Sequence, residues 1–167
     1  MSRPPTEGEL VAAARRLGDR LGRVGWQLAV AESCTGGLVG HLLTESPSAS
    51  DHFLGGVVCY SPAVKCSLLG VPEELIDRVG TVAPEVAEAL VDGTLARFPA
   101  AELAVAVTGL AGPDGAEGKP VGLTYVAVAR RGEGARIERR IFEHARDGNK
   151  RAAALLALEI AGAVAGE

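Results

Sequence analysis

The sequence predicts a three-layer α/β/α sandwich built on a mostly parallel, five-stranded mixed sheet, and three observations lead to this prediction. Short apolar stretches alternate with segments of helical spacing along the chain, which is typical of α/β folds. Two of these stretches, 27–31 and 102–110, are apolar along their length, as strands covered on both faces should be. The last two stretches flank "RGEG", which is typical of a hairpin turn and predicts one antiparallel strand.

Length and composition set the class of protein. The chain has 167 residues, of which 47% are hydrophobic and 23% charged, so we expect one soluble domain over 1–167. A net charge of −4 argues against a nucleic-acid partner, and no apolar stretch approaches the roughly 18 residues of a membrane span. The first residues lack the apolar stretch of a secretion signal, and the three cysteines show no CxxC spacing. These features predict a cytoplasmic protein without a zinc site.

The helices are predicted from periodicity and capping residues. Thr6 and Glu9 have the spacing of a capping box, and apolar residues follow at helical spacing as far as Val24. Pro84 suits the first turn of another helix. After the first helix, the expected helices cover 37–45, 62–69, 72–79, 84–98 and 146–165.

The strands are expected over 27–31, 53–61, 102–110, 121–130 and 135–143. In such sheets, binding sites gather beyond the carboxyl ends of the strands. Two of these ends carry unusual loops, "ESCTGG" after the first strand and "TGLAGPDGAEGKP" after the third. Neither loop matches a P-loop, a dinucleotide-binding GxGxxG or a GxSxG nucleophile turn.

Ser33, in the first of these loops, has two interpretations. Its hydroxyl could cap the following helix, although Thr35 could do so equally well, or it could be a nucleophile. Lys65 could be a solvated lysine or a base, and Tyr60 could serve in packing or in the site. Serine–lysine pairs carry out acyl transfer without histidine. His41, His52 and His144 lack metal-ligand spacing, and the sequence does not support a Ser-His-Asp triad.

Four motifs in order give the chain a resemblance to a known family. They are "AESCTGGLVGHLL", "FLGGVVCYSPAVKCSLLGV", "AVTGLAGPDG…KPVGLTYVAVA" and the late Arg146. Over roughly residues 8–165 the sequence resembles the C-terminal domain family of the competence-damage-inducible protein CinA, the nicotinamide-nucleotide amidase family. The larger N-terminal domain of full-length CinA proteins is absent from this sequence, so the resemblance implies the stand-alone form.

The resemblance implies an amidase that hydrolyses nicotinamide mononucleotide to nicotinic acid mononucleotide and ammonia, a step of pyridine nucleotide salvage. It places the serine nucleophile on Ser33 and the assisting tyrosine and lysine on Tyr60 and Lys65. We expect no cofactor, a pyridine nucleotide as the small-molecule partner, and a homo-oligomer such as a dimer. Ala83, Pro62 and "HAR" at 144–146 depart from the family pattern, which bears on substrate preference.

The remaining site residues are expected to bind the substrate. Backbone amides at the start of the first helix after Ser33 suit an oxyanion, and the second loop suits the nucleotide. The best candidate for the phosphate is Arg146, at the entrance to the last helix. The full set of expected binding residues is Cys34, Thr35, Gly36, Gly37, Thr108, Gly109, Gly112 and Arg146.

Two alternatives remain open at the level of the sequence. The chain could be a nucleotide-binding module that regulates or partners another protein and has no turnover. It could also be a serine–lysine amidase or esterase that acts on another substrate.

Overall fold

The computed structural model of the protein describes residues 3–166 and has the predicted alternation of helices and strands. The strands are β1 (Leu28–Glu32), β2 (Phe53–Val58), β3 (Leu103–Gly109), β4 (Leu123–Arg130) and β5 (Arg136–Ile141). The helices are α1 (Glu7–Val24), α2 (Leu38–Leu43), α3 (Pro62–Leu69), α4 (Glu73–Val79), α5 (Pro84–Arg97) and α6 (Arg146–Val164), with a 3-10 turn at Ala49–Asp51.

The five strands form one sheet in the order β2-β1-β3-β4-β5. β1 pairs in parallel with β2 on one side and β3 on the other. β4 runs antiparallel to β3, and β5 runs antiparallel to β4. Four strands therefore point the same way and β4 alone is reversed, which confirms the predicted sheet.

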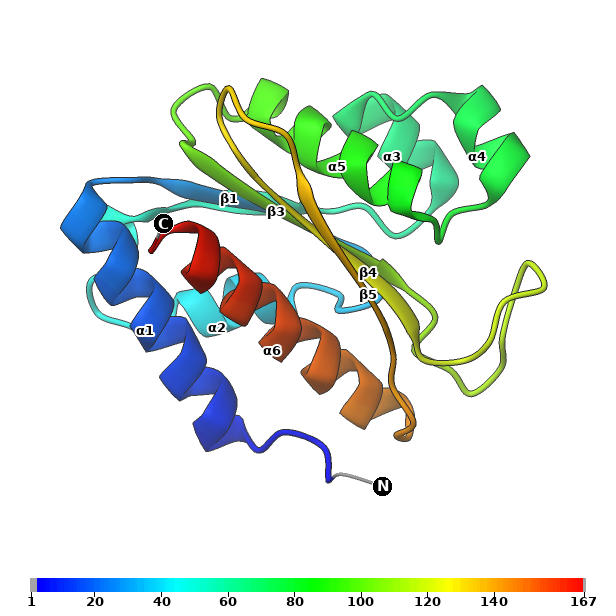
Figure 1. The fold of residues 1–167 in the computed structure, drawn as a ribbon, viewed down its shortest axis with the longest axis horizontal. Coiled ribbons are helices and arrows are strands. Elements are labelled where there is room, and N and C mark those ends of the chain that lie inside the picture. Colours follow the sequence, from blue (N-terminus) through cyan, green and yellow to red (C-terminus); the bar gives the residue numbers. More distant parts are fainter. Residues whose placement is uncertain (1–2, 167) are drawn as a thin grey trace.

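Helices cover both faces of the sheet (Figure 1). α1, α2 and α6 lie on one face, and α3, α4 and α5 lie on the other. This arrangement confirms the three-layer sandwich. Within the part of the chain that the structure describes, no helix is long and apolar enough to cross a membrane.

The two faces of the central strands carry side chains of different size, because successive residues of a strand point to opposite faces. The face toward α1, α2 and α6 presents large aliphatic side chains, whereas the face toward α5 presents alanines. The large residues are Leu28, Val30, Leu103, Val105, Val107, Val126 and Val128. The alanines are Ala29, Ala31, Ala104, Ala106, Ala127 and Ala129. Small side chains let α5 approach the sheet closely, and α3 packs against α5.

Local capping explains where the elements begin and end. The predicted capping box is present, because Thr6 accepts the amide of Glu9 and the Glu9 carboxylate accepts the amide of Thr6 at 2.8 Å. The strand predicted over 53–61 ends earlier, at Val58, because Ser61 is instead the N-cap of α3. The first strand extends one residue further than predicted, since Glu32 pairs with Val58.

Candidate active site

Ser33 lies directly beyond β1 at the carboxyl edge of the sheet and is 7% exposed. Its amide donates to the carbonyl of Val107 in β3 at 3.1 Å, and the carbonyl of Glu32 accepts the amide of Cys59 at 2.8 Å. The strand alternation directs Glu32 toward α2 and Ser33 toward the layer that contains α3. The neighbouring strands therefore fix the backbone on both sides of the Ser33 side chain.

Lys65 reaches Ser33 from the first turns of α3. Its Nζ lies 3.0 Å from Ser33 Oγ, and it also donates to the carbonyl of Cys59 and, at 3.4 Å, to that of Tyr60. The residue is 0% exposed, and this burial lowers the pKa of the Lys65 amine from its ordinary value. Among residues 3–166, no carboxylate forms an ion pair with Lys65. Nζ donates in all three contacts, which account for the three N–H groups of an ammonium; when the amine loses a proton, its lone pair can instead accept the proton of the Ser33 hydroxyl.

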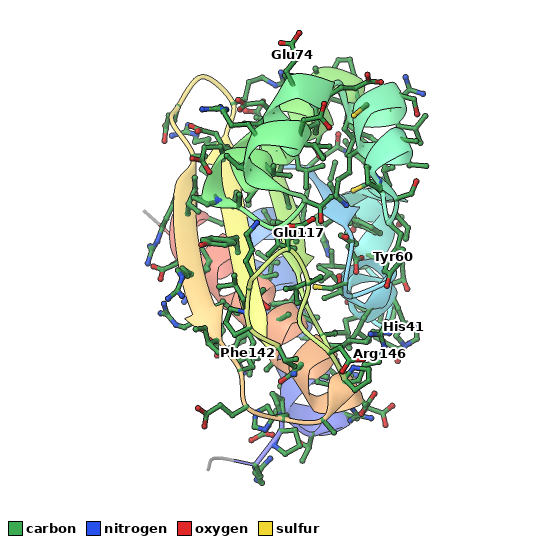
Figure 2. All side chains as sticks on the ribbon, turned by 90° about the vertical axis from the view of Figure 1, so that its right-hand side faces the viewer. His41, Tyr60, Glu74, Glu117, Phe142 and Arg146 are labelled. Atoms are coloured by element: carbon green, nitrogen blue, oxygen red, sulfur yellow. The ribbon has the colours of Figure 1, made fainter. Side chains whose placement is uncertain are left out.

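Tyr60 and Arg146 lie together on the side of the molecule where β1 and β3 end (Figure 2). The Tyr60 side chain is exposed, and its hydroxyl lies 3.5 Å from the Arg146 guanidinium. That guanidinium also donates to the carbonyl of Gly112, in the second loop. Tyr60 contacts Lys65 through its carbonyl and not through its phenol, so Lys65 meets Ser33 directly.

The turn after Ser33 is organised by Glu32, a residue that the sequence analysis did not single out. Its carboxylate accepts the amides of Gly37 at 3.0 Å, Val39 at 3.1 Å and Gly40 at 2.8 Å. The N-cap of α2 is Gly37, with φ +98°, and no side chain of its own can cap the helix. The expectation that Ser33 or Thr35 could cap this helix is therefore wrong, because Glu32 takes the donors that a cap would bind.

The same contacts narrow the set of amides that could face an oxyanion. The Gly37 amide is bound by Glu32, and the Gly36 amide donates to the carbonyl of Ser33 at 3.1 Å. Of the four amides expected at this turn, those of Cys34 and Thr35 have no hydrogen-bond acceptor on another residue within the described part of the chain. The Thr35 hydroxyl is buried and also has no hydrogen-bond partner within residues 3–166.

The second loop lies against the first at Gly109. A Cβ on this residue would come within 2.8 Å of Thr124 Oγ1 and 3.1 Å of Cys34 Sγ, so the close approach requires glycine. The Thr108 hydroxyl, expected to face the substrate, donates to the carbonyl of Thr81 at 2.8 Å. The structure thus brings both predicted loops together, but it uses the Thr108 proton within the protein.

A link between distant segments, which was not predicted from the sequence, holds this second loop. Glu117 accepts the Thr81 amide at 2.9 Å and pairs with Lys119 at 3.0 Å. Burial raises the pKa of Glu117, but the contacts with Thr81 and Lys119 outweigh this effect and hold it below its ordinary value. No pattern in the sequence indicates the link, because its partners belong to segments 36 residues apart.

The remaining titratable groups near the turn do not provide another nucleophile or a metal site. The Cys34 thiol is buried, and this burial raises its pKa to about 11, which suits a packing role. In residues 3–166, no three His, Cys, Asp or Glu side chains are grouped so that they could hold a metal ion. Nor does any described histidine side chain hydrogen-bond to Ser33 or Lys65.

The fold and the site together define an α/β/α sandwich with a serine–lysine pair at the carboxyl edge of its sheet. The sequence profile of the CinA C-terminal domain matches residues 11–164, and the chain belongs to this family. The crystal structure of the competence/damage inducible protein CihA from Agrobacterium tumefaciens is similar to it. The TM-score is 0.90 at 34% identity, over 100% of each chain.

Curated relatives fall into two lengths. The nicotinamide-nucleotide amidohydrolase PncC of Pseudomonas putida is 44% identical over 153 residues, which cover 90% of this chain and 93% of that protein. The CinA-like protein of Trichormus variabilis is 47% identical over 118 residues, which cover 70% of this chain. The alignment spans only 28% of that longer relative. The domain therefore occurs both as nearly a whole protein and as part of a longer one.

Proposed function

We propose that this chain hydrolyses the carboxamide of nicotinamide mononucleotide, releasing nicotinic acid mononucleotide and ammonia, with Ser33 as the nucleophile. The observation that carries the proposal is the buried Lys65 Nζ, 3.0 Å from Ser33 Oγ. The name and the 44% identity of the Pseudomonas putida amidohydrolase support the choice of substrate. Such a reaction would belong to pyridine nucleotide salvage.

The chemistry proceeds through an acyl-enzyme. Neutral Lys65 takes the Ser33 proton while Oγ attacks the carboxamide carbon, and the amides of Cys34 and Thr35 stabilise the oxyanion. The tetrahedral intermediate collapses, the C–N bond breaks, and the Lys65 ammonium returns its proton to the departing nitrogen, which leaves as ammonia. Water then attacks the ester, again giving a proton to Lys65, and the acid product leaves with Ser33 restored.

Ammonia release from purified protein incubated with nicotinamide mononucleotide tests the proposed activity. We expect ammonia and nicotinic acid mononucleotide in equal amounts without added metal, and the Ser33→Ala variant controls for a contaminating amidase. Binding of the nucleotide without ammonia release would overturn the proposal in favour of a nucleotide-binding module. Release from unrelated amides or esters but not from this nucleotide would favour another substrate.

The pH dependence of kcat/KM is expected to follow Lys65. The free amine is the active form, and burial places its pKa below the ordinary 10.5, so the rate should rise with pH along a limb below that value. The unfolded chain holds this proton to higher pH than the folded chain, so the free energy of unfolding should rise with pH between the lowered pKa of the folded chain and the ordinary 10.5, above the rising limb of the rate profile. Profiles of kcat/KM against pH measure the first effect, and denaturant titrations from neutral to alkaline pH measure the free energy of unfolding. A rate that falls with pH throughout this interval would contradict the role of Lys65.

Arg146 is expected to bind the substrate phosphate. It begins the 19-residue helix α6, whose positive end favours an anion, and the Gly112 carbonyl holds its side chain at the mouth of the site. Arg146→Ala should raise KM strongly for nicotinamide mononucleotide and change little for nicotinamide riboside, which lacks the phosphate. Equal losses on both substrates would show instead that Arg146 supports the structure of the site. Lys150, whose Nζ lies 3.7 Å from where a Cβ of Gly36 would be, would then be tested next.

A further inference from the structure

The carboxylate of Glu32 is an unusual group to find beside a nucleophile. The residue is 2% exposed, and within residues 3–166 no cation forms an ion pair with it. Its charge is met by three backbone amides, from Gly37, Val39 and Gly40, at 2.8 to 3.1 Å. Burying a carboxylate is unfavourable unless hydrogen bonds compensate it, and here each oxygen accepts at least one.

These hydrogen bonds fix both ends of the short backbone segment that contains Ser33. Glu32 immediately precedes the nucleophile, whereas its partners begin at Gly37, so the segment 33–36 is held at both ends by one side chain. Within this segment, Gly36 donates to the Ser33 carbonyl at 3.1 Å, and its φ of +64° is in the left-handed region. The positions of Ser33 Oγ and of the Cys34 and Thr35 amides therefore depend on the length and charge of the Glu32 side chain.

We propose that Glu32 is a positioning residue for the reaction, an inference that rests on the proposed amidase function. Its carboxylate binds the amides of α2, so that only those of Cys34 and Thr35 remain for the oxyanion, and it holds Ser33 Oγ in line with Lys65. If Glu32 only capped α2, its hydrogen bonds with the helix would be explained, but its position directly before Ser33 would not. The residue that holds the helix is the chain neighbour of the nucleophile, so any shift of α2 is transmitted to Ser33.

Glu32→Gln tests this role, because glutamine keeps the size of the side chain but replaces one acceptor oxygen with an NH₂ donor. Whichever way the amide is turned, this donor faces at least one of the backbone N–H groups that Glu32 now accepts. We expect kcat to fall about 10²-fold with little change in KM, since small misplacements of reacting groups have effects of that size. Glu9→Gln is the matched control: this carboxylate also accepts a backbone amide, but its hydrogen-bond partners are Arg3 and Thr6 on the N-terminal segment. Its kcat should not change.

A second measurement separates failure of this inference from failure of the proposed function. A fluorophosphonate reacts with an activated serine by forming an Oγ–P bond and expelling fluoride, whatever the natural substrate. Labelling of Ser33, followed by mass spectrometry, should slow in Glu32→Gln by the same factor as kcat. If the native protein is labelled but releases no ammonia, the proposed substrate is wrong, and the labelling rates alone then decide the role of Glu32.

The inference is overturned if Glu32→Gln melts at lower temperature but keeps its labelling rate and kcat, because the carboxylate would then only stabilise the helix. If the glutamine variant does not fold, the same measurements are made on Glu32→Asp, which keeps the charge but shortens the side chain by one methylene. A slower labelling rate in the folded aspartate variant supports positioning, and an unchanged rate overturns it.

Discussion

Replacing Ser33 with alanine is expected to lower turnover by about 10³-fold or more while the fold and nucleotide binding persist. The change removes the attacking oxygen, and within residues 3–166 the only side chain hydrogen-bonded to this oxygen is that of Lys65. Because Glu32 and not Ser33 caps α2, the variant loses no helix cap, so its stability should change little. Steady-state kinetics, nucleotide binding by calorimetry and thermal melting measure the three quantities.

Thr6→Ala is a suitable control for the Ser33 variant. Thr6 is a true N-cap, and its loss should lower the free energy of unfolding by about 1 kcal/mol with turnover unchanged. Ser33→Ala should therefore lose turnover and keep its stability, whereas Thr6→Ala should lose stability and keep its turnover. Near-normal turnover in Ser33→Ala would rule out the covalent mechanism.

Lys65→Met is expected to abolish turnover to a similar extent, and Lys65→Arg should not restore it. Methionine has a similar length but no amine, whereas arginine keeps its proton at any working pH and cannot act as a base. The double variant with Ser33→Ala should be no slower than either single variant, because the two groups act in one step. These kinetic comparisons require folded variants. Both Lys65→Met and Lys65→Arg change the hydrogen-bond partners of the Cys59 and Tyr60 carbonyls, which Lys65 now binds.

An active Lys65→Arg variant would contradict this assignment. It would show that position 65 supplies positive charge and that the base is another group. Circular dichroism of each variant, measured before the kinetics, distinguishes loss of chemistry from loss of fold.

Much of the fold could be predicted because its determinants are local. The capping box at Thr6 and Glu9 set the start of α1, and the apolar stretches identified the central strands. The directions of the strands followed from where the helices and the hairpin lie between them, whereas their order, β2-β1-β3-β4-β5, was not predicted from the sequence. Element ends were less accurate, as at Ser61, where capping of the next helix overrides the β-propensity of the sequence before it.

The site could be predicted only in part. Motif order brought Ser33 and Lys65 into consideration together, but their contact depends on how closely α3 approaches the sheet. A carboxylate at the end of an apolar strand, followed by two glycines, could have indicated Glu32, yet its acceptor role depends on the path of the turn. The pairing of Glu117 with Thr81 depends on tertiary structure alone.

The difference in side-chain size between the two faces of the sheet has a consequence for how this domain can evolve. The alanine face sets the thickness of the layer from which Lys65 extends, and a lysine side chain has a fixed maximum length. A larger residue in place of Ala106 would push α5, and α3 with it, away from Ser33. On the opposite face, exchanges among Val, Leu and Ile in β3 and β4 change a layer that packs against α6 and holds neither Lys65 nor the amides bound by Glu32. Drift in the sequence is therefore freer beneath α6 than beneath α5, although both sets of residues are buried.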